Sequence, residues 1–471
     1  MSEQSTPLKV TALAASAQLG GTERVLLDFA NRAFEHDVAL RVLTPRDGPL
    51  VTILNKIGVP AETVPAPERL LRGSQREGGL WSLPPAMLAM RGWAKQVADH
   101  PFVTDAEVVY TIAFKTHVAG ALARLHPVVW HLHEFPPKKT RWVWRILSGR
   151  VPDRMIAVSD AVGDAWAGSA DEVLHAEDAG QRDASKRIAV VHNGVNLDRF
   201  QPRERTGWIH EELGIPREHR IIGMPAVFAR WKGQLEVLEA FSQIADQFPD
   251  VHLVIVGGSI YDTVAERQYG EQLEQATGEW EITTSSGGVW ESVEPGSGEW
   301  RVPSEPTDPG AGAKEGASAA SEVTRGKRTS GPIPGSRLPR VHILPFQKEI
   351  ELAYPEFDLT IHYSLRPEPF GRVIVESMAC GVPIVAADEG GPREIVGDGI
   401  GPRREAGWLA EPRNPTELAR ILHSALSLPT EVLASIGTAG RERAEDDFSS
   451  RAFSARLAAV LKETAGTGKR G

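Results

Sequence analysis

The stretch RPEPFGRVIVESMACGVPIVAADEGGPREIV, residues 366–396, carries the strongest pattern in the chain. We predict a helix over about 371–380 and a strand over 383–386, which together form a helix-and-strand unit. Residues 370–372 open the helix, where free backbone N–H groups bind anions such as a diphosphate. The stretch therefore predicts a phosphate site at a helix N-terminus.

Two carboxylates lie eight positions apart in this stretch, Glu368 before the helix and Glu376 about one turn inside it. Glu376 is placed to accept hydrogen bonds from ribose hydroxyls, and Glu368 is placed to face a sugar. Acidic residues near a helix start are common because they complement the helix dipole, so two glutamates alone carry little weight. After the next strand, the segment Glu389, Gly390 and Gly391 allows close backbone approach.

The rest of the chain alternates strands with helices in two series. We predict strands at 8–15, 38–43, 107–112, 127–131, 154–158 and 188–192, and then at 220–227, 251–256, 341–344, 359–362 and 383–386. Such repeats imply parallel sheets with helices on both faces, and ligands at the carboxyl ends of the strands. The prediction is an α/β protein with two Rossmann-like, doubly wound domains facing a cleft, over 1–200 and 201–445. A C-terminal helix and a flexible tail follow over 446–471.

The second series is interrupted over 278–337 by a segment of different composition. Of its 60 residues, 11 are Gly, 9 are Ser and 6 are Pro, and none is Leu or Phe. Such a segment buries too little apolar surface to fold by itself, so we predict a disordered insertion. Trp280, Trp290 and Trp300 recur every ten residues, which leaves a small strand meander or a binding element as alternatives.

Charge and composition exclude several classes of protein. The 52 basic and 62 acidic residues give a formal charge of −10, which argues against nucleic acid as the main partner. Cys380 is the single cysteine, the N-terminus lacks the apolar region of a signal peptide, and no run of 18 apolar residues occurs. These features predict a cytoplasmic protein.

One basic segment suggests contact with a membrane. Residues 137–150, PKKTRWVWRILSGR, contain five basic residues, two tryptophans and no acid, a composition that suits anionic lipid head groups. The simpler reading is an amphipathic helix with one core face and one solvated basic face. Peripheral attachment at the inner membrane face is the corresponding prediction.

The block EPFGRVIVESMACGVPIVA resembles the signature of the retaining glycosyltransferases of family GT4, which have the GT-B fold. In that family, two glutamates in the spacing E-x7-E contact the nucleotide-sugar donor. The resemblance implies that Glu376 binds the ribose and that Glu368 lies at the sugar and the reacting centre. It also implies that backbone N–H groups around Phe370, Gly371 and Arg372 hold the donor phosphates.

Other segments resemble motifs of the same family. SAQLGGTER, residues 16–24, resembles its glycine loop, with Gly20 and Gly21 closing on donor and acceptor, and VVHNGVNLDRF, residues 190–200, resembles its interdomain segment. We expect Thr22 to cap a helix beginning at Glu23.

A further motif, FARWKGQ, supplies the cations that the resemblance assigns to the diphosphate, Arg230 and Lys232. Two fixed cations offset the charge of a departing nucleotide diphosphate. The family places them about five apart, whereas only Trp231 intervenes here.

Two histidines end a predicted strand in VVWHLHEF. The spacing of His131 and His133 suits two metal ligands, but no third and fourth ligand pattern lies nearby. The family places a histidine in this region near the sugar, which selects His133, and a satisfied structural histidine is the alternative. No D-x-D pair occurs, which favours a mechanism without a metal or another cofactor.

The combined prediction is a glycosyltransferase of polysaccharide biosynthesis that moves a hexose-type sugar from a nucleotide-diphosphate sugar. The acceptor is a glycan, a lipid-linked molecule or a small molecule, bound mainly by the first domain, with the donor bound mainly by the second. The resemblance implies retention of configuration by front-side displacement. One alternative is a non-catalytic nucleotide-sugar-binding protein of the same fold. The other is a nicotinamide-dependent oxidoreductase, against which stands the missing G-x-G-x-x-G after the first strand.

Overall fold

The computed structural model describes residues 6–72, 84–137, 141–167, 173–174, 187–258, 264–277, 340–397 and 406–468. The predicted insertion at 278–337, with its three tryptophans, lies outside these residues. So do Lys138, Lys139 and Thr140 of the basic segment.

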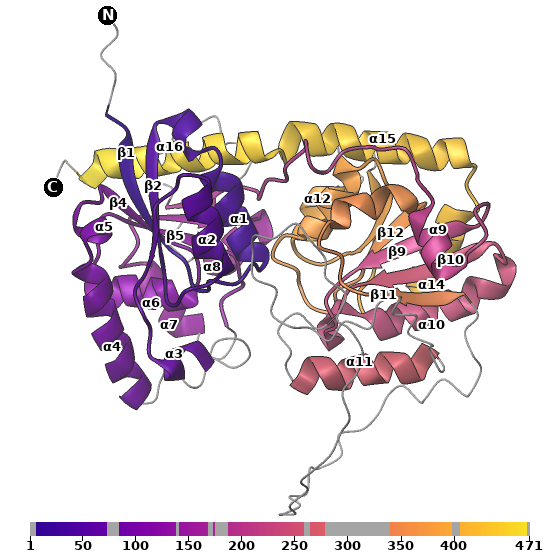
Figure 1. The fold of residues 1–471 in the computed structure, drawn as a ribbon, viewed down its shortest axis with the longest axis horizontal. Coiled ribbons are helices and arrows are strands. Elements are labelled where there is room, and N and C mark those ends of the chain that lie inside the picture. Colours follow the sequence, from indigo (N-terminus) through magenta and orange to yellow (C-terminus); the bar gives the residue numbers. More distant parts are fainter. Residues whose placement is uncertain are drawn as a thin grey trace, which may run out of the picture.

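The N-terminal domain is built on a parallel sheet with the strand order β3-β2-β1-β4-β5-β6-β8-β7. Its strands are β1 (Leu8–Leu13), β2 (Val38–Thr44), β3 (Ala61–Thr63), β4 (Val108–Thr111), β5 (Val128–Leu132), β6 (Arg154–Ala157), β7 (Val173–Leu174) and β8 (Ile188–Val190). Every residue of β4, β5 and β6 is buried, because helices cover both faces of the sheet. The continuous apolar runs of the sequence thus become central strands (Figure 1).

Helices connect these strands and cover the sheet. They are α1 (Gly21–Ala30), η1 (Ala33–His36), α2 (Pro49–Lys56), α3 (Glu68–Arg72), α4 (Pro84–Ala98), α5 (Pro101–Thr104), α6 (Phe114–Ala123), α7 (Arg141–Ser148) and α8 (Asp160–Trp166). In α7, which belongs to the basic segment, the Trp144 ring lies 4.7 Å from that of Phe114 and 5.8 Å from that of Trp166. This tryptophan supplies the core face of the predicted amphipathic helix. Membrane contact through 137–150 stays a prediction.

The C-terminal domain has a second parallel sheet, with the order β11-β10-β9-β12-β13-β14. Its strands are β9 (Arg220–Pro225), β10 (Val251–Val256), β11 (Val341–Leu344), β12 (Leu359–His362), β13 (Ile384–Ala387) and β14 (Gly407–Ala410). In both sheets the strand order reverses next to the first strand, at β1 and at β9. The predicted pair of doubly wound domains is therefore confirmed, and each reversal marks the edge where such folds bind ligands.

The second sheet is flanked by helices on both sides. They are α9 (Trp208–Leu213), η5 (Arg230–Lys232), α10 (Gln234–Ile244), η6 (Ala245–Gln247), α11 (Val264–Thr277), η7 (Ile350–Leu352), η8 (Tyr354–Glu356), α12 (Arg372–Ala379), α13 (Gly391–Val396), α14 (Pro415–Leu426) and α15 (Thr430–Asp447). The chain then returns to the first domain in α16 (Ser450–Gly468), so that α15 and α16 run along both domains (Figure 1).

Helix α16, which fills most of the range predicted for the C-terminal helix and tail, belongs to the core of the first domain. Its residues Phe453, Leu457 and Leu461 are buried in one cluster with Leu26 and Phe29 of α1. The domains are thus joined twice, once through the segment after β8 and once between α15 and α16.

These two crossings are held together by backbone pairing at Val195. Val195 N donates to Phe448 O at 2.8 Å, and Ser450 N donates to Val195 O at 2.9 Å. A side chain at Gly194 would place its Cβ 2.5 Å from the Cα of Ser450. The glycine of the interdomain motif is therefore explained by close approach of two backbones.

The start of α1 differs from the prediction. The helix begins at Gly21 with Gly20 as N-cap, so Thr22 is not the capping residue. Glu23 then occupies the third helical position, where the backbone N–H groups of Glu23 and Gly20 lower the pKa of its carboxyl group. A glycine N-cap replaces the hydroxyl cap that the sequence suggested.

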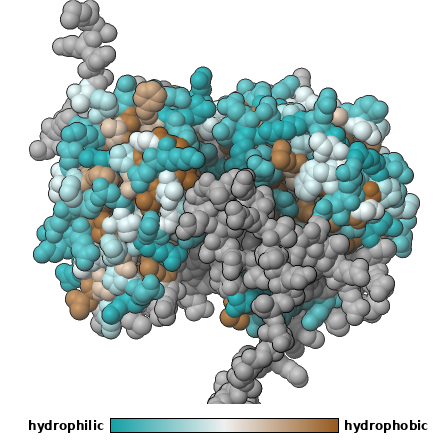
Figure 2. Space-filling view, viewed as in Figure 1, coloured by the Kyte–Doolittle hydropathy of each residue, from teal (hydrophilic) through white to brown (hydrophobic). Residues whose placement is uncertain are grey.

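No helix of the described ranges is both long and apolar enough to span a bilayer. Hydrophilic residues cover most of the coloured surface in Figure 2.

Candidate functional site

Glu368 lies in the loop after β12 and is surrounded by three polar side chains. Lys232 Nζ donates to its Oε2 at 3.0 Å, Ser364 Oγ donates to the same oxygen at 2.8 Å, and His362 Nε2 lies 3.5 Å from it. Burial by itself raises the pKa of Glu368, but Lys232 and His362 outweigh burial and hold this pKa well below its ordinary value. The carboxylate is therefore ionised and held in one place.

Two glycines fix the loop that carries Glu368. Gly391 N donates to Glu368 O at 2.9 Å, and Glu368 and Gly390 form an isolated parallel bridge. Gly390 has φ +81°, and a Cβ there would lie 2.5 Å from Glu368 O. The close approach predicted for this glycine pair is thus an approach to the protein's own backbone. These contacts fix the backbone position of Glu368.

Helix α12 begins where the sequence places it. Gly371 is its N-cap, with φ +108°, and the helix starts at Arg372. The first N–H groups of a helix have no intrahelical acceptor, so they are available to an anion. Phe370 is 3% exposed, and its ring lies 5.9 Å from that of Phe448. Only the backbone of Phe370 is thus available to a ligand.

Glu376 is buried one turn into α12. Its Oε2 accepts from the hydroxyl of Tyr354 at 3.2 Å, and its Oε1 lies 3.5 Å from Nε of Arg372. The burial of Glu376 beside Tyr354 explains why the pKa of that phenol is raised well above its usual range, first by desolvation and then by the carboxylate. An acceptor oxygen at this place is compatible with a ribose hydroxyl, and the ribose contact of Glu376 stays a prediction.

The side chain of Arg372 joins the two domains. Its Nη1 donates to Asp28 Oδ2 of α1 at 2.9 Å and to Gly194 O at 3.1 Å. The predicted donor-binding role of Arg372 therefore rests on its backbone N–H.

Lys232 and Arg230 point to different partners, although both lie in η5 after β9. Lys232 reaches Glu368, whereas Arg230 is held by both oxygens of Glu236, at 2.7 and 2.5 Å. The Arg230 side chain is 53% exposed, and that of Lys232 is 14% exposed. The structure thus brings Lys232 but not Arg230 to Glu368.

Gly20 ends the loop after β1, at the carboxyl edge of the first sheet, and Gly21 is the first residue of α1. Nothing lies within 4 Å of the position where a Cβ of Gly21 would stand. Burial raises the pKa of Glu23, the residue that caps this loop, to about 7, against the pull of the backbone N–H groups of Glu23 and Gly20. The loop therefore offers open space beside a proton-holding carboxyl group.

His133 follows β5 and has a ring nitrogen without a partner. Its Nε2 is buried and has no hydrogen-bond partner among the described residues. Burial, and then the charge of Arg372, lower the pKa of His133 to about 3, so the imidazole is neutral. His131, its ring centroid 4.0 Å away, bonds through Nδ1 to the hydroxyl of Tyr110. Nε2 of His131 likewise has no partner among the described residues, but His131 is fully buried, whereas His133 is half-buried and is thus the histidine of this pair that a ligand can reach.

Several site residues escaped the sequence analysis. His362 and Ser364 contact Glu368, and their place at the end of β12 was the signal that could have found them. Asp28 and Tyr354, which hold Arg372 and Glu376, gave no local signal.

In the described part of the chain, one group of side chains has the spacing of metal ligands, namely Asp160, His192 and Glu394. Both carboxylate oxygens of Glu394 already accept hydrogen bonds. They come from the N–H of Asp160 at 2.7 Å, the N–H of Ala161 at 2.8 Å and Nε2 of His192 at 3.0 Å. This arrangement fits a helix cap between the domains better than it fits a metal site.

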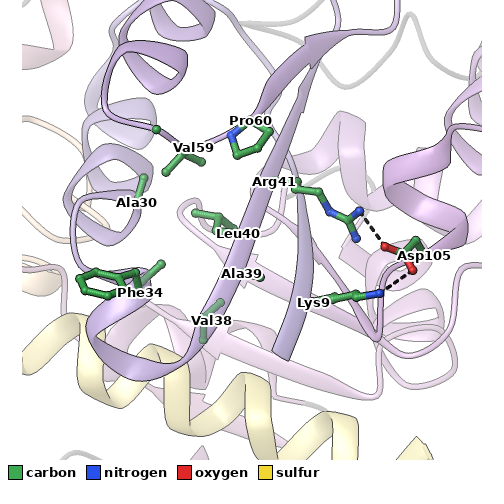
Figure 3. A pocket seen from close by; sticks show the side chains of 12 residues that line it. Lys9, Ala30, Phe34, Val38, Ala39, Leu40, Arg41, Val59, Pro60 and Asp105 are labelled. Atoms are coloured by element: carbon green, nitrogen blue, oxygen red, sulfur yellow. Dashed lines mark hydrogen bonds and ion pairs between the residues drawn. The ribbon is translucent and has the colours of Figure 1, made fainter. Parts of the chain in front are cut away.

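Two hollows help to place the site. One of about 610 Å³ is lined by polar residues, including Glu389, Gly390 and Arg413, and adjoins the Glu368 loop through Gly390. The other, of about 370 Å³, lies between η1 and the starts of β1 and β2, where Lys9 and Arg41 pair with Asp105 (Figure 3). The second hollow is at the opposite edge of the sheet and contains none of the predicted site residues.

Two family models together match most of the chain. "Glycosyl transferases group 1" matches residues 208–294 and 338–443, and "Glycosyltransferase Family 4" matches residues 19–199. Alpha-maltose-1-phosphate synthase of Mycolicibacterium smegmatis is 27% identical over 374 residues, which cover 75% of this chain and 78% of that protein. An alpha-1,3/1,6-mannosyltransferase of Neurospora crassa is 35% identical over 101 residues, only 21% of this chain and 20% of the relative.

Solved structures share the fold. Anabaena HepE in complex with UDP-glucose superposes with a TM-score of 0.65 and 24% identity, over 97% of this chain and 100% of that chain. At this identity the likeness shows the architecture alone. With both domains matched by family models, and with this architecture, the chain belongs to glycosyltransferase family 4 and has the GT-B fold.

Proposed function

We propose that this protein is a retaining glycosyltransferase that moves a hexose from a nucleotide-diphosphate sugar to a glycan, a lipid-linked molecule or a small molecule. The observation that carries the proposal is the ion pair of Lys232 and Glu368 beside the start of α12, with Glu376 one turn further on. Lys232 and the helix N-terminus each suit one phosphate of a diphosphate. Glu368 suits a sugar, and Glu376 suits a ribose.

The reaction depends mainly on stabilising the negative charge that develops on the departing diphosphate. The bond between the sugar C1 and the phosphate oxygen breaks, and a bond between C1 and the acceptor oxygen forms on the same face. The acceptor proton passes to the departing diphosphate oxygen. Lys232 and the N–H groups of α12 stabilise the negative charge that grows on the diphosphate, so the mechanism needs no metal.

Glu368 and His133 would hold the sugar and the acceptor. The ionised carboxylate of Glu368 accepts hydrogen bonds from sugar hydroxyls, and its field favours the positive charge that develops at C1. The unpartnered Nε2 of neutral His133 can bond a hydroxyl of the sugar or of the acceptor. The role of these side chains is to orient the reactants rather than to remove a proton.

The anomer of the first product tests the proposal. Many glycosyltransferases hydrolyse their donor slowly when water takes the place of the acceptor, so UDP-glucose, GDP-mannose and ADP-glucose are each incubated with the protein and followed by proton NMR. Retention predicts that the α anomer of the free sugar appears first with one donor, and that Glu368→Gln releases it far more slowly. A β anomer appearing first would contradict the mechanism.

A second function has one observation in its favour. Arg230, expected at the diphosphate, is instead paired with Glu236, which removes a cation from the site. A protein that binds nucleotide sugars without turning them over would show donor binding but neither hydrolysis nor transfer in the same experiment.

A further inference from the structure

The N-terminal domain presents a charged helix face to the donor side of the site. Arg24 and Asp28 lie one turn apart on α1, at positions i and i+4, and so share one face of this helix. Asp28 is bonded to Arg372 of α12, and Arg372 lies 3.5 Å from Glu376. The face of α1 that carries Arg24 is therefore the face turned toward Glu376.

The electrostatics of Arg24 agree with this placement. Burial lowers the pKa of Arg24 below its ordinary value, Glu376 and Asp28 attract its charge, and Arg199 and Arg372 repel it. Three arginines thus lie near Asp28 and Glu376, and a third carboxylate, Glu351, pairs with Arg199. The formal charges of this group balance, so what distinguishes Arg24 is its bonding.

The three arginines differ in their partners. Arg372 is bonded to Asp28 and to Gly194 O, and Arg199 is bonded to Glu351 at 2.8 Å. Arg24 makes no side-chain hydrogen bond and no ion pair within 4 Å to any residue that the structure describes. A guanidinium carries five N–H donors, and those of Arg24 have no side-chain acceptor among the described residues.

We propose that Arg24 is a donor-binding residue of the N-terminal domain and that its guanidinium binds a phosphate oxygen of the nucleotide diphosphate. This inference rests on the proposed function, since it takes the ribose to lie at Glu376 and the diphosphate at the start of α12. The planar fork of a guanidinium matches two phosphate oxygens, and the anion supplies the acceptors that the described residues do not offer to Arg24. The open space at Gly21, three residues before Arg24, lets a ligand approach.

The position of Arg24 bears on how the two domains hold the diphosphate before and after sugar transfer. Arg24 lies on one domain, whereas Lys232 and α12 lie on the other, so the diphosphate would be held from both sides. Binding of the diphosphate would then strengthen the same contact between α1 and α12 that Asp28 and Arg372 make. After the sugar has been transferred to the acceptor, the nucleotide diphosphate would stay bound to both domains until the two domains separate.

The test compares diphosphates with nucleosides by calorimetric titration of Arg24→Gln, Arg24→Lys and the wild type. The probes are UDP, GDP and ADP, with uridine, guanosine and adenosine as their phosphate-free counterparts. Arg32→Gln is the matched control, because Arg32 follows the same helix but pairs with Glu35 at its exposed end. Melting of each ligand-free variant verifies that it is folded.

Arg24→Gln is expected to weaken binding of the preferred diphosphate by about tenfold or more, with nucleoside binding unchanged. Arg24→Lys should retain part of the affinity, and Arg32→Gln all of it. Equal loss for diphosphate and nucleoside would overturn the phosphate contact, as would unchanged diphosphate binding. If the wild type binds no diphosphate at all, the proposed function fails together with this inference, so the two failures are distinguishable.

Discussion

Lys232 Nζ lies 3.0 Å from Oε2 of Glu368, and the two side chains are only 14% and 15% exposed. The pair joins the loop after β9 to the loop after β12, strands that are neighbours in the sheet. Lys232 thereby keeps the carboxylate of Glu368 ionised. In the proposed function this carboxylate lies at the reacting centre and the same lysine stabilises the diphosphate.

Replacing Lys232 by Met should destabilise the ligand-free protein by about 3 kcal/mol, because the buried carboxylate of Glu368 loses its main counter-charge. Arg230→Met, which breaks an exposed pair, should cost less than about 1 kcal/mol. Urea unfolding of both variants measures the difference. In the double variant Lys232→Met with Glu368→Gln, stability should recover while donor hydrolysis does not. Equal costs for the two single variants would contradict the assignment of Lys232 to the site.

The sequence predicted this part of the site because its signals are local. The glycine at the start of α12 and the glutamates on either side of it lie within one short stretch. The resemblance then added the cations, but it could not say which of them reaches Glu368. The 3-10 turn η5 decides that question, since it directs Arg230 to Glu236 and Lys232 to Glu368.

Contacts between the domains could not be predicted in this way. Asp28 and Arg372 are 344 positions apart, and no periodicity links them. The predicted start of α1, at Glu23, was wrong because the prediction relied on a local signal. A hydroxyl at Thr22 is a strong local cap signal, but the helix begins two residues earlier than predicted, at Gly21, with Gly20 as its N-cap.

Glu23→Gln should make the protein more stable at pH 8 than the wild type, with the gap shrinking toward pH 4.5. The pKa of Glu23 is raised from 4.5 to about 7, so the folded state holds its proton more tightly than the unfolded state. Stability from this group is full below pH 4.5 and is lost as pH rises to about 7, by up to about 3 kcal/mol. Glutamine has nearly the same shape as glutamate but never ionises.

The free energy of unfolding of the wild type and of Glu23→Gln, measured at several pH values, gives this difference in stability. Glu35→Gln, in the exposed pair with Arg32, gives the baseline for replacing a glutamate by glutamine. A gap that stays constant from pH 4.5 to 8 would show that Glu23 does not titrate near pH 7.

Glu394→Ala should loosen the two domains. Its carboxylate caps α8 of the first domain through the N–H groups of Asp160 and Ala161, and it also bonds to His192. Loss of a helix cap costs about 1 kcal/mol, and the first domain loses a direct contact with α13. Small-angle scattering should therefore show a larger radius of gyration, while Glu417→Ala, at an exposed pair with Arg420, leaves the radius unchanged. An unchanged radius for Glu394→Ala would mean that other contacts hold the domains.

The most direct test of the donor site is thermal melting of the wild type and Glu376→Ala with UDP-, GDP- and ADP-sugars in the absence of metal. A ligand that binds only the folded state raises the melting temperature by mass action. We predict that one class of nucleotide sugar raises the melting temperature of the wild type and that Glu376→Ala loses this rise. No rise with any donor, or an equal rise in Glu376→Ala, would contradict the placement of the nucleotide at Glu376.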